Sequence, residues 1–135
     1  MVTRMTRNDD WPEALAGFID ARRNEPFAWG SNDCALFAAD AIKEMTGVDL
    51  AENLRGYTTA QGATRKINSA GGMRNFAAAL TEKHHGLAQR GDVVLVEVEG
   101  RETFGVVVGN GKWCAPGVDG LVFRPMDEVR VVFGV

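Results

Sequence analysis

A cysteine stands where the sequence predicts the first turn of a helix, at the end of residues 29–34, which read WGSNDC. Unpaired backbone N–H groups and the helix dipole favour a negative charge at such a position. We therefore expect a lowered pKa for the Cys34 thiol, which prepares a cysteine to act as a nucleophile. The alternative is a small buried residue without chemistry, because Cys34 shares a helical stripe with Phe37 and Ala41.

The helix that carries this cysteine is the second of four that the sequence predicts. Three consecutive N-cap residues, 31–33, precede it, and Gly47 is a favourable C-cap. A first helix is expected to begin near Asp10, with Pro12 tolerated in its opening turn, and to end before Pro26. Together these helices place the thiol at the edge of a buried layer.

Two shorter helices are expected further along the chain. Thr59 is a suitable N-cap for one of them, and the Gly-Gly pair at 71–72 ends it. The other carries an apolar stripe made of Met73, Phe76, Ala77 and Leu80.

Beyond Gly91 the hydrophobic period changes to two, which is typical of β-strands. Gly100 and the Asn-Gly pair at 110–111 predict tight turns between strands. The expected strands cover residues 92–98, 103–108, 112–115, 121–124 and 129–133. Helices packed on one antiparallel sheet of four to five short strands make an α+β fold.

Composition indicates a single domain over residues 1–135, of which the polar residues 1–10 are expected to be flexible. Hydrophobic residues make up 45% of the chain, and the net charge of -3 argues against a nucleic-acid partner. No apolar run approaches the roughly 20 residues needed to span a membrane, and no signal peptide is evident. Two cysteines are too few for a disulfide scaffold or a metal site, so we expect no metal and no cofactor.

Three segments, taken in order, resemble the NlpC-type branch of the papain-like cysteine peptidases, which are bacterial and phage cell-wall hydrolases. They are residues 29–34 with the helix that follows, residues 91–95 (GDVVL) and residues 105–111 (GVVVGNG). The order and spacing agree from about Phe27 to Phe123. The resemblance implies a papain-like fold in which Cys34 begins the central helix. The short length and residues 61–63 resemble the versions encoded in phage and prophage tail operons.

The chain departs from the family pattern at both imidazole positions. The family's general base is a histidine at the start of a strand, and that position falls on Thr103. A second residue, often histidine in a His-Ala pair, orients the first, and the matching position is Cys114. A threonine hydroxyl cannot take a proton near neutral pH, and a cysteine orients a base poorly. The resemblance therefore implies that Cys34 is a candidate nucleophile without its base.

The other ionisable residues offer no obvious replacement for this base. His84 and His85 precede the first predicted strand of the hairpin, whose start lies roughly 20 Å from the position of Thr103. We interpret both as exposed residues at a helix end. A carboxylate of Glu99 or Glu102 would raise the pKa of the thiol, so we interpret these residues as a solvated turn.

Candidate binding residues adjoin the thiol. We name Trp29, Asn32 and Asp33, where Trp29 is either core or groove wall. Asp33 is either an N-cap, the interpretation we favour, or a groove residue for a substrate amine, as the resemblance implies. Cys114 is expected to be small and buried, with Trp113 on the opposite face of the sheet. A redox-sensitive pair of the two cysteines is a further alternative.

These observations favour a phage or prophage tail-tip or tail-assembly protein whose NlpC-like fold has impaired catalysis. Its partners would be other tail proteins, and it would be found in the cytoplasm after synthesis or in the virion tail. The alternative is an active peptidoglycan hydrolase that uses Cys34 on the peptide of the cell wall. The discriminating feature is the missing imidazole, which leads us to expect an inactive rather than an active peptidase.

Overall fold

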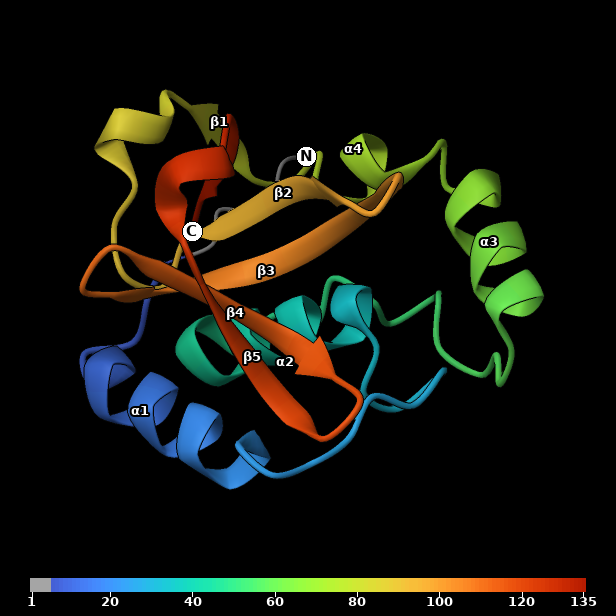
Figure 1. Ribbon diagram of the computed structural model, residues 1–135, viewed down its shortest axis with the longest axis horizontal. Helices are drawn as coiled ribbons and strands as arrows, with labels where there is room; N and C mark the ends of the chain where they lie inside the picture. The colour runs from blue at the N-terminus through green and yellow to red at the C-terminus, as the bar shows by residue number, and fades with distance from the viewer. Residues whose placement is uncertain (1–5) are drawn as a thin grey trace.

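Helices gather in the first half of the chain and strands in the second, as the change of hydrophobic period predicts. The computed structural model describes residues 6–135, except for the side chains of Arg74 and Phe76. The helices are α1 (Trp11–Arg22), α2 (Cys34–Thr46), α3 (Ala60–Ser69) and the single turn α4 (Met73–Phe76), with 3-10 turns η1 (His85–Leu87) and η2 (Met126–Glu128). The strands are β1 (Thr81–Lys83), β2 (Val93–Val98), β3 (Arg101–Gly109), β4 (Lys112–Gly117), β5 (Gly120–Pro125) and β6 (Val131–Gly134) (Figure 1).

All six strands form one antiparallel sheet in the order β1-β6-β2-β3-β4-β5. The predicted α+β fold is confirmed, with one strand more than the four to five expected. The extra strand, β1, is short and mostly exposed, and it exists because it pairs with β6 at the sheet edge. The hairpin of β2 and β3 turns at Glu99 (φ 52°) and Gly100 (φ 77°), both in the left-handed region that tight hairpins require.

Helix α2 is the central helix, and its ends are the ones that the sequence predicts. Asp33 caps its N-terminus, and Gly47 ends it in the left-handed conformation with φ 82°. Phe37 is completely buried and packs against Phe18 of α1, with ring centroids 5.2 Å apart. The same helix packs against β3 and β4, so Cys34, at its first position, faces the middle of the sheet. Figure 1 shows α2 between α1 and these strands.

The two faces of the sheet bury different sets of side chains. Cys114 points into the core shared with α1 and α2, whereas Trp113 lies in a second apolar cluster on the opposite face, as predicted. The register partner of Trp113 on β3 is Val107, and its indole packs against Gly105 of the same strand. A Cβ at Gly105 would stand 2.3 Å from the indole Cε3. This close approach keeps the indole buried.

The expected stripe at residues 73–80 forms a shorter helix than its spacing suggests. Met73 and Leu80 pack against the main core, and Ala77 is 2% exposed. The side chain of Phe76 lies outside the described residues. None of the helices in residues 6–135 has the length and apolar character needed to cross a membrane.

A buried carboxylate ties both chain ends to the sheet. Asp92, 1% exposed, accepts from Arg7 at 3.1 Å and pairs with Lys83 at 2.5 Å. The backbone N–H of Val135 also donates to it at 3.3 Å, and Arg7 donates to the carbonyl oxygen of Val135. Residues 1–10 were expected to be flexible, and 1–5 of them lie outside the described residues.

Candidate functional site

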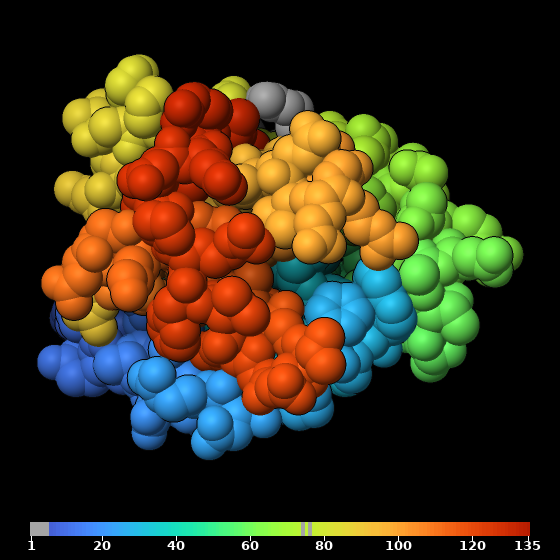
Figure 2. Space-filling view, in the orientation of Figure 1, coloured from blue at the N-terminus to red at the C-terminus, as the bar shows by residue number. Residues whose placement is uncertain are grey.

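Cys34 lies where two pockets meet. One pocket, which we call the α3-side pocket, is walled by α3 and Tyr57, and the other, the sheet-side pocket, by β3, β4 and β5. Trp29, Cys34, Arg101 and Glu102 line both, so the thiol lies at the centre of one continuous groove. Figure 2 shows the hollow between the β2–β3 turn, the β4–β5 turn and the loop before α2.

Strand β3 runs directly past the sulfur. A backbone hydrogen bond from Phe104 reaches Cys34, and the neighbouring Thr103 lines the sheet-side pocket together with the thiol. The position that the family pattern gives to a general base is therefore at the groove. The Thr103 hydroxyl donates to the carbonyl oxygen of Arg101 at 3.4 Å, and it has no basic nitrogen with which to accept the thiol proton.

The expected lowering of the Cys34 pKa is wrong. Burial raises the pKa of this thiol above its ordinary value of 9.0, and the adjacent Asp33 carboxylate raises it further. Backbone hydrogen bonds from Phe104 and from the helix start at Ala35 act in the predicted, lowering direction, but the loss of water outweighs them. Burial therefore favours the neutral thiol over the thiolate.

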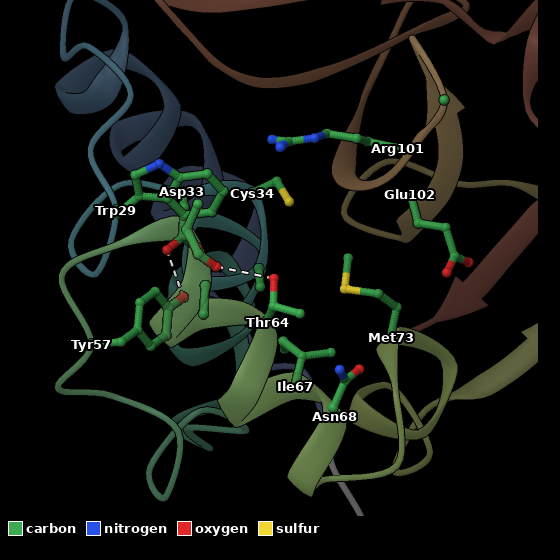
Figure 3. A pocket seen from close by; sticks show the side chains of 14 residues that line it. Trp29, Asp33, Cys34, Tyr57, Thr64, Ile67, Asn68, Met73, Arg101 and Glu102 are labelled. Atoms are coloured by element: carbon green, nitrogen blue, oxygen red, sulfur yellow. Dashed lines mark hydrogen bonds between the residues drawn. The ribbon is translucent and has the colours of Figure 1, made fainter.

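The Asp33 carboxylate is fully occupied by the protein itself. It is 1% exposed and accepts from the N–H of Leu36 at 3.0 Å and the N–H of Gly30 at 3.0 Å. It also accepts from the Tyr57 hydroxyl at 2.5 Å (Figure 3). The N-cap interpretation is confirmed. Burial and the carboxylate together raise the pKa of Tyr57, so its hydroxyl remains a donor. Although Asp33 borders the α3-side pocket, no oxygen of its carboxylate is left without a donor.

A glycine allows Tyr57 to approach the loop before α2. Gly30 has φ +83°, and a Cβ there would stand 1.8 Å from the carbonyl oxygen of Tyr57. Sequence reasoning missed Tyr57, although it is the single tyrosine of the chain. No motif of its own marks this residue, since its partner lies 24 positions away.

Asn32 does not line the groove, contrary to its expected binding role. It is completely buried, donates to the carbonyl oxygens of Glu25 and Pro26, and accepts from Arg22 at 3.2 Å. Arg22 also pairs with Asp40 of α2 at 2.8 Å. Asn32 therefore fixes the loop that presents Cys34. Its environment was not visible in the sequence because its partners come from α1 and the chain after it.

The two histidines lie away from the groove. His84 and His85 are exposed at η1, stack with ring centroids 4.2 Å apart and line neither pocket. They follow β1 instead of ending an α-helix, which corrects that detail of the prediction. Glu99 and Glu102 are exposed at the hairpin turn, as expected. Within residues 6–135 no three potential metal-ligating side chains converge.

Cys114 is a buried core residue, as predicted. It is 0% exposed, and burial raises its pKa to about 12. Both cysteines are free thiols. A thiol buried in apolar surroundings is inert toward oxidation and exchange, so the redox pair finds no support at Cys114.

Arg101 is a groove residue that sequence reasoning missed. In Figure 3 its guanidinium extends from the β2–β3 turn toward Cys34 and Trp29, whereas the carboxylate of Glu102 turns away. Met73 and Ile67 provide apolar surface on the opposite side of the same pocket. The groove therefore combines an apolar wall, an aromatic wall and a cation beside the thiol of Cys34.

The architecture is the NlpC-type papain-like fold. The structure resembles the NlpC/p60 domain of the peptidoglycan hydrolase SagA with TM-score 0.63 and 15% identity, over 92% of this chain and 98% of that one. It also resembles RipD of Mycobacterium tuberculosis, a non-catalytic NlpC/p60 protein adapted to peptidoglycan binding, with TM-score 0.52 and 14% identity over 95% and 99% of the two chains. The P60 domain of the Mycobacterium avium paratuberculosis antigen MAP1272c gives TM-score 0.51 and 15% identity over 93% of each chain.

The comparison with family models assigns the chain to one sequence family. Residues 6–135 match the model of DUF6950, a domain of unknown function, so the chain belongs to that family. No curated protein is similar enough in sequence to count as a relative.

Proposed function

We propose that this domain binds a peptide of the cell wall in the groove around Cys34 and does not cleave it. The observation that carries the proposal is a groove lined by Cys34 in which Thr103 stands at the position of the general base, with no imidazole among its lining residues. A missing general base costs about 10² to 10⁴ in rate, before the loss of thiolate is counted. The groove itself, with its apolar and aromatic walls, is intact.

The structural relatives support both halves of this proposal. SagA is a peptidoglycan hydrolase, and RipD is described as non-catalytic and adapted to peptidoglycan binding. This chain has a thiol, Cys34, at the position that the resemblance gives to the nucleophile, and Thr103 at the position that it gives to the base. We propose, from the resemblance of residues 61–63 to the phage and prophage versions, that it serves in a phage or prophage tail tip or in tail assembly.

Binding and cleavage can be measured on one substrate. The probe is the stem tripeptide L-Ala-γ-D-Glu-L-Lys, with titration calorimetry for binding and mass spectrometry for cleavage. We expect the wild type to bind it without cleavage, and Cys34→Ala to bind it within about twofold, because the thiol forms no covalent bond. Cys114→Ala serves as the matched cysteine control.

Two outcomes would overturn this function. Cleavage by the wild type that disappears in Cys34→Ala would establish the alternative, an active hydrolase. Absence of binding would remove the peptide from the proposal. The tail setting has its own test, which is quantitative mass spectrometry of tail particles and tail intermediates from the source strain. Absence of the chain from both would contradict that setting.

A further inference from the structure

Two arginines at one end of the groove carry charges that the protein does not neutralise. Arg65 on α3 and Arg101 on the β2–β3 turn are both exposed and line one open pocket together with Thr64. Thr64 and Arg101 also line the α3-side pocket, so the two spaces are continuous. Within the described part of the chain, neither guanidinium has an ion-pair partner.

Several other arginines of this chain form ion pairs with carboxylates. Arg7 pairs with buried Asp92, Arg22 pairs with Asp40, and Arg55 pairs with Asp40 at 2.7 Å and Asp49 at 3.0 Å. Those pairs join α1 and the loop after α2 to α2, and join the segment before α1 to the start of β2. Arg65 and Arg101 hold no element in place, and their shared position at the groove is not explained by the fold.

The two carboxylates that line the α3-side pocket, those of Asp33 and Glu102, form no ion pair with these arginines. Asp33 is buried and already accepts three hydrogen bonds. Glu102 turns its carboxylate away from the space that Arg101 enters (Figure 3). On a molecule of net charge -3, two unpaired guanidinium groups form a local site of opposite sign, which favours an anionic group of a ligand.

We infer that this end of the groove binds a carboxylate of an acidic peptide, with Arg65 and Arg101 as the residues that determine this specificity. The inference rests on the proposed peptide binding and names the chemical class of the peptide. A guanidinium offers paired N–H donors that match the two oxygens of a carboxylate. The apolar part of the peptide then lies over Met73 and Ile67, toward Cys34.

The test compares two forms of the tripeptide L-Ala-γ-D-Glu-L-Lys: the diacid, and the diamide in which both carboxylates are carboxamides. We expect the diacid to bind about tenfold more tightly than the diamide, with the difference shrinking at high salt. Arg65→Gln and Arg101→Gln should each weaken binding of the diacid by about three- to fivefold and leave the diamide unchanged, as for exposed ion pairs.

The matched control is Arg130→Gln, which removes the same charge from a side chain that bonds backbone carbonyl oxygens of Asp127 and Val129. Equal binding of diacid and diamide would overturn the inference and leave peptide binding intact. The inference also falls if Arg130→Gln weakens the diacid as much as Arg101→Gln does, since only net charge would then matter. If neither peptide binds, the proposed function fails and the inference fails with it.

Discussion

The reactivity of Cys34 provides a direct test of how the groove treats its thiol. Only the thiolate is alkylated at a useful rate, so the rate follows the ionised fraction. The structure raises the pKa of Cys34 above 9.0. At pH 7 less than about 1% of such a thiol is ionised, and alkylation should be at least about 100-fold slower than for the full thiolate.

The assay follows iodoacetamide alkylation by mass spectrometry between about pH 6 and pH 10. Cys114→Ala leaves one thiol, so every adduct reports on Cys34. We expect the rate to rise about tenfold per pH unit up to pH 9 without a plateau. The same variant in guanidinium chloride is the control, because unfolding removes the burial that raises the pKa.

If the alkylation rate of Cys34 reaches half of its maximum below pH 8, this reasoning is refuted. It would mean that the helix start governs the thiol and that the burial around Cys34 does not. The hydrolase alternative would then regain its activated nucleophile.

Three further predictions concern stability. Phe37→Ala removes a fully buried ring packed on Phe18 and should lower the free energy of unfolding in urea by about 3 to 5 kcal/mol. The control is Val118→Ala, at a site 84% exposed, which should change this free energy by less than about 0.5 kcal/mol. A loss below about 1 kcal/mol for Phe37→Ala would contradict the central place of α2. Asp92→Asn should lower the free energy of unfolding by about 3 kcal/mol in the same assay, because Arg7 and Lys83 lose their buried partner. An unchanged urea midpoint would argue against a stabilising role of these ion pairs. Stability should fall as the pH rises from about 9 toward 12, because Cys114, whose folded pKa is about 12, keeps a proton that the unfolded chain releases. The melting temperature of Cys114→Ala should therefore decrease less steeply with pH than that of the wild type. Equal slopes for the two proteins would contradict this role of Cys114.

Local signals in the sequence predicted most of the fold. The caps at Asp33, Thr59 and Gly47 act within one helical turn, so their residue types are sufficient evidence. The left-handed turn at Asn110 and Gly111 is equally local. Strand β1 was missed because residues 81–83 have no alternating pattern, and only their pairing with β6 makes them a strand.

The site was predicted less completely because its properties depend on residues far apart in the chain. The helix start at Cys34 indicated backbone hydrogen bonds that lower the pKa of the thiol, but the burial that outweighs them comes from tertiary packing. Tyr57 and Arg101 reach the groove through a loop and a hairpin turn that carry no spacing signal of their own. Thr103, singled out by its position before residues 105–111, lines the sheet-side pocket, and its role as the former base position stays a prediction.

The groove also contains a tryptophan whose fluorescence can report on ligand binding. Trp29 lines both pockets beside Cys34 and packs edge-on against Phe27, with ring centroids 4.7 Å apart. Trp11 stacks against Arg7 elsewhere, and Trp113 is only 2% exposed. A ligand bound in the α3-side pocket contacts Trp29 and neither of the other two tryptophans. Binding can therefore be followed by a change in intrinsic tryptophan fluorescence, without an added dye.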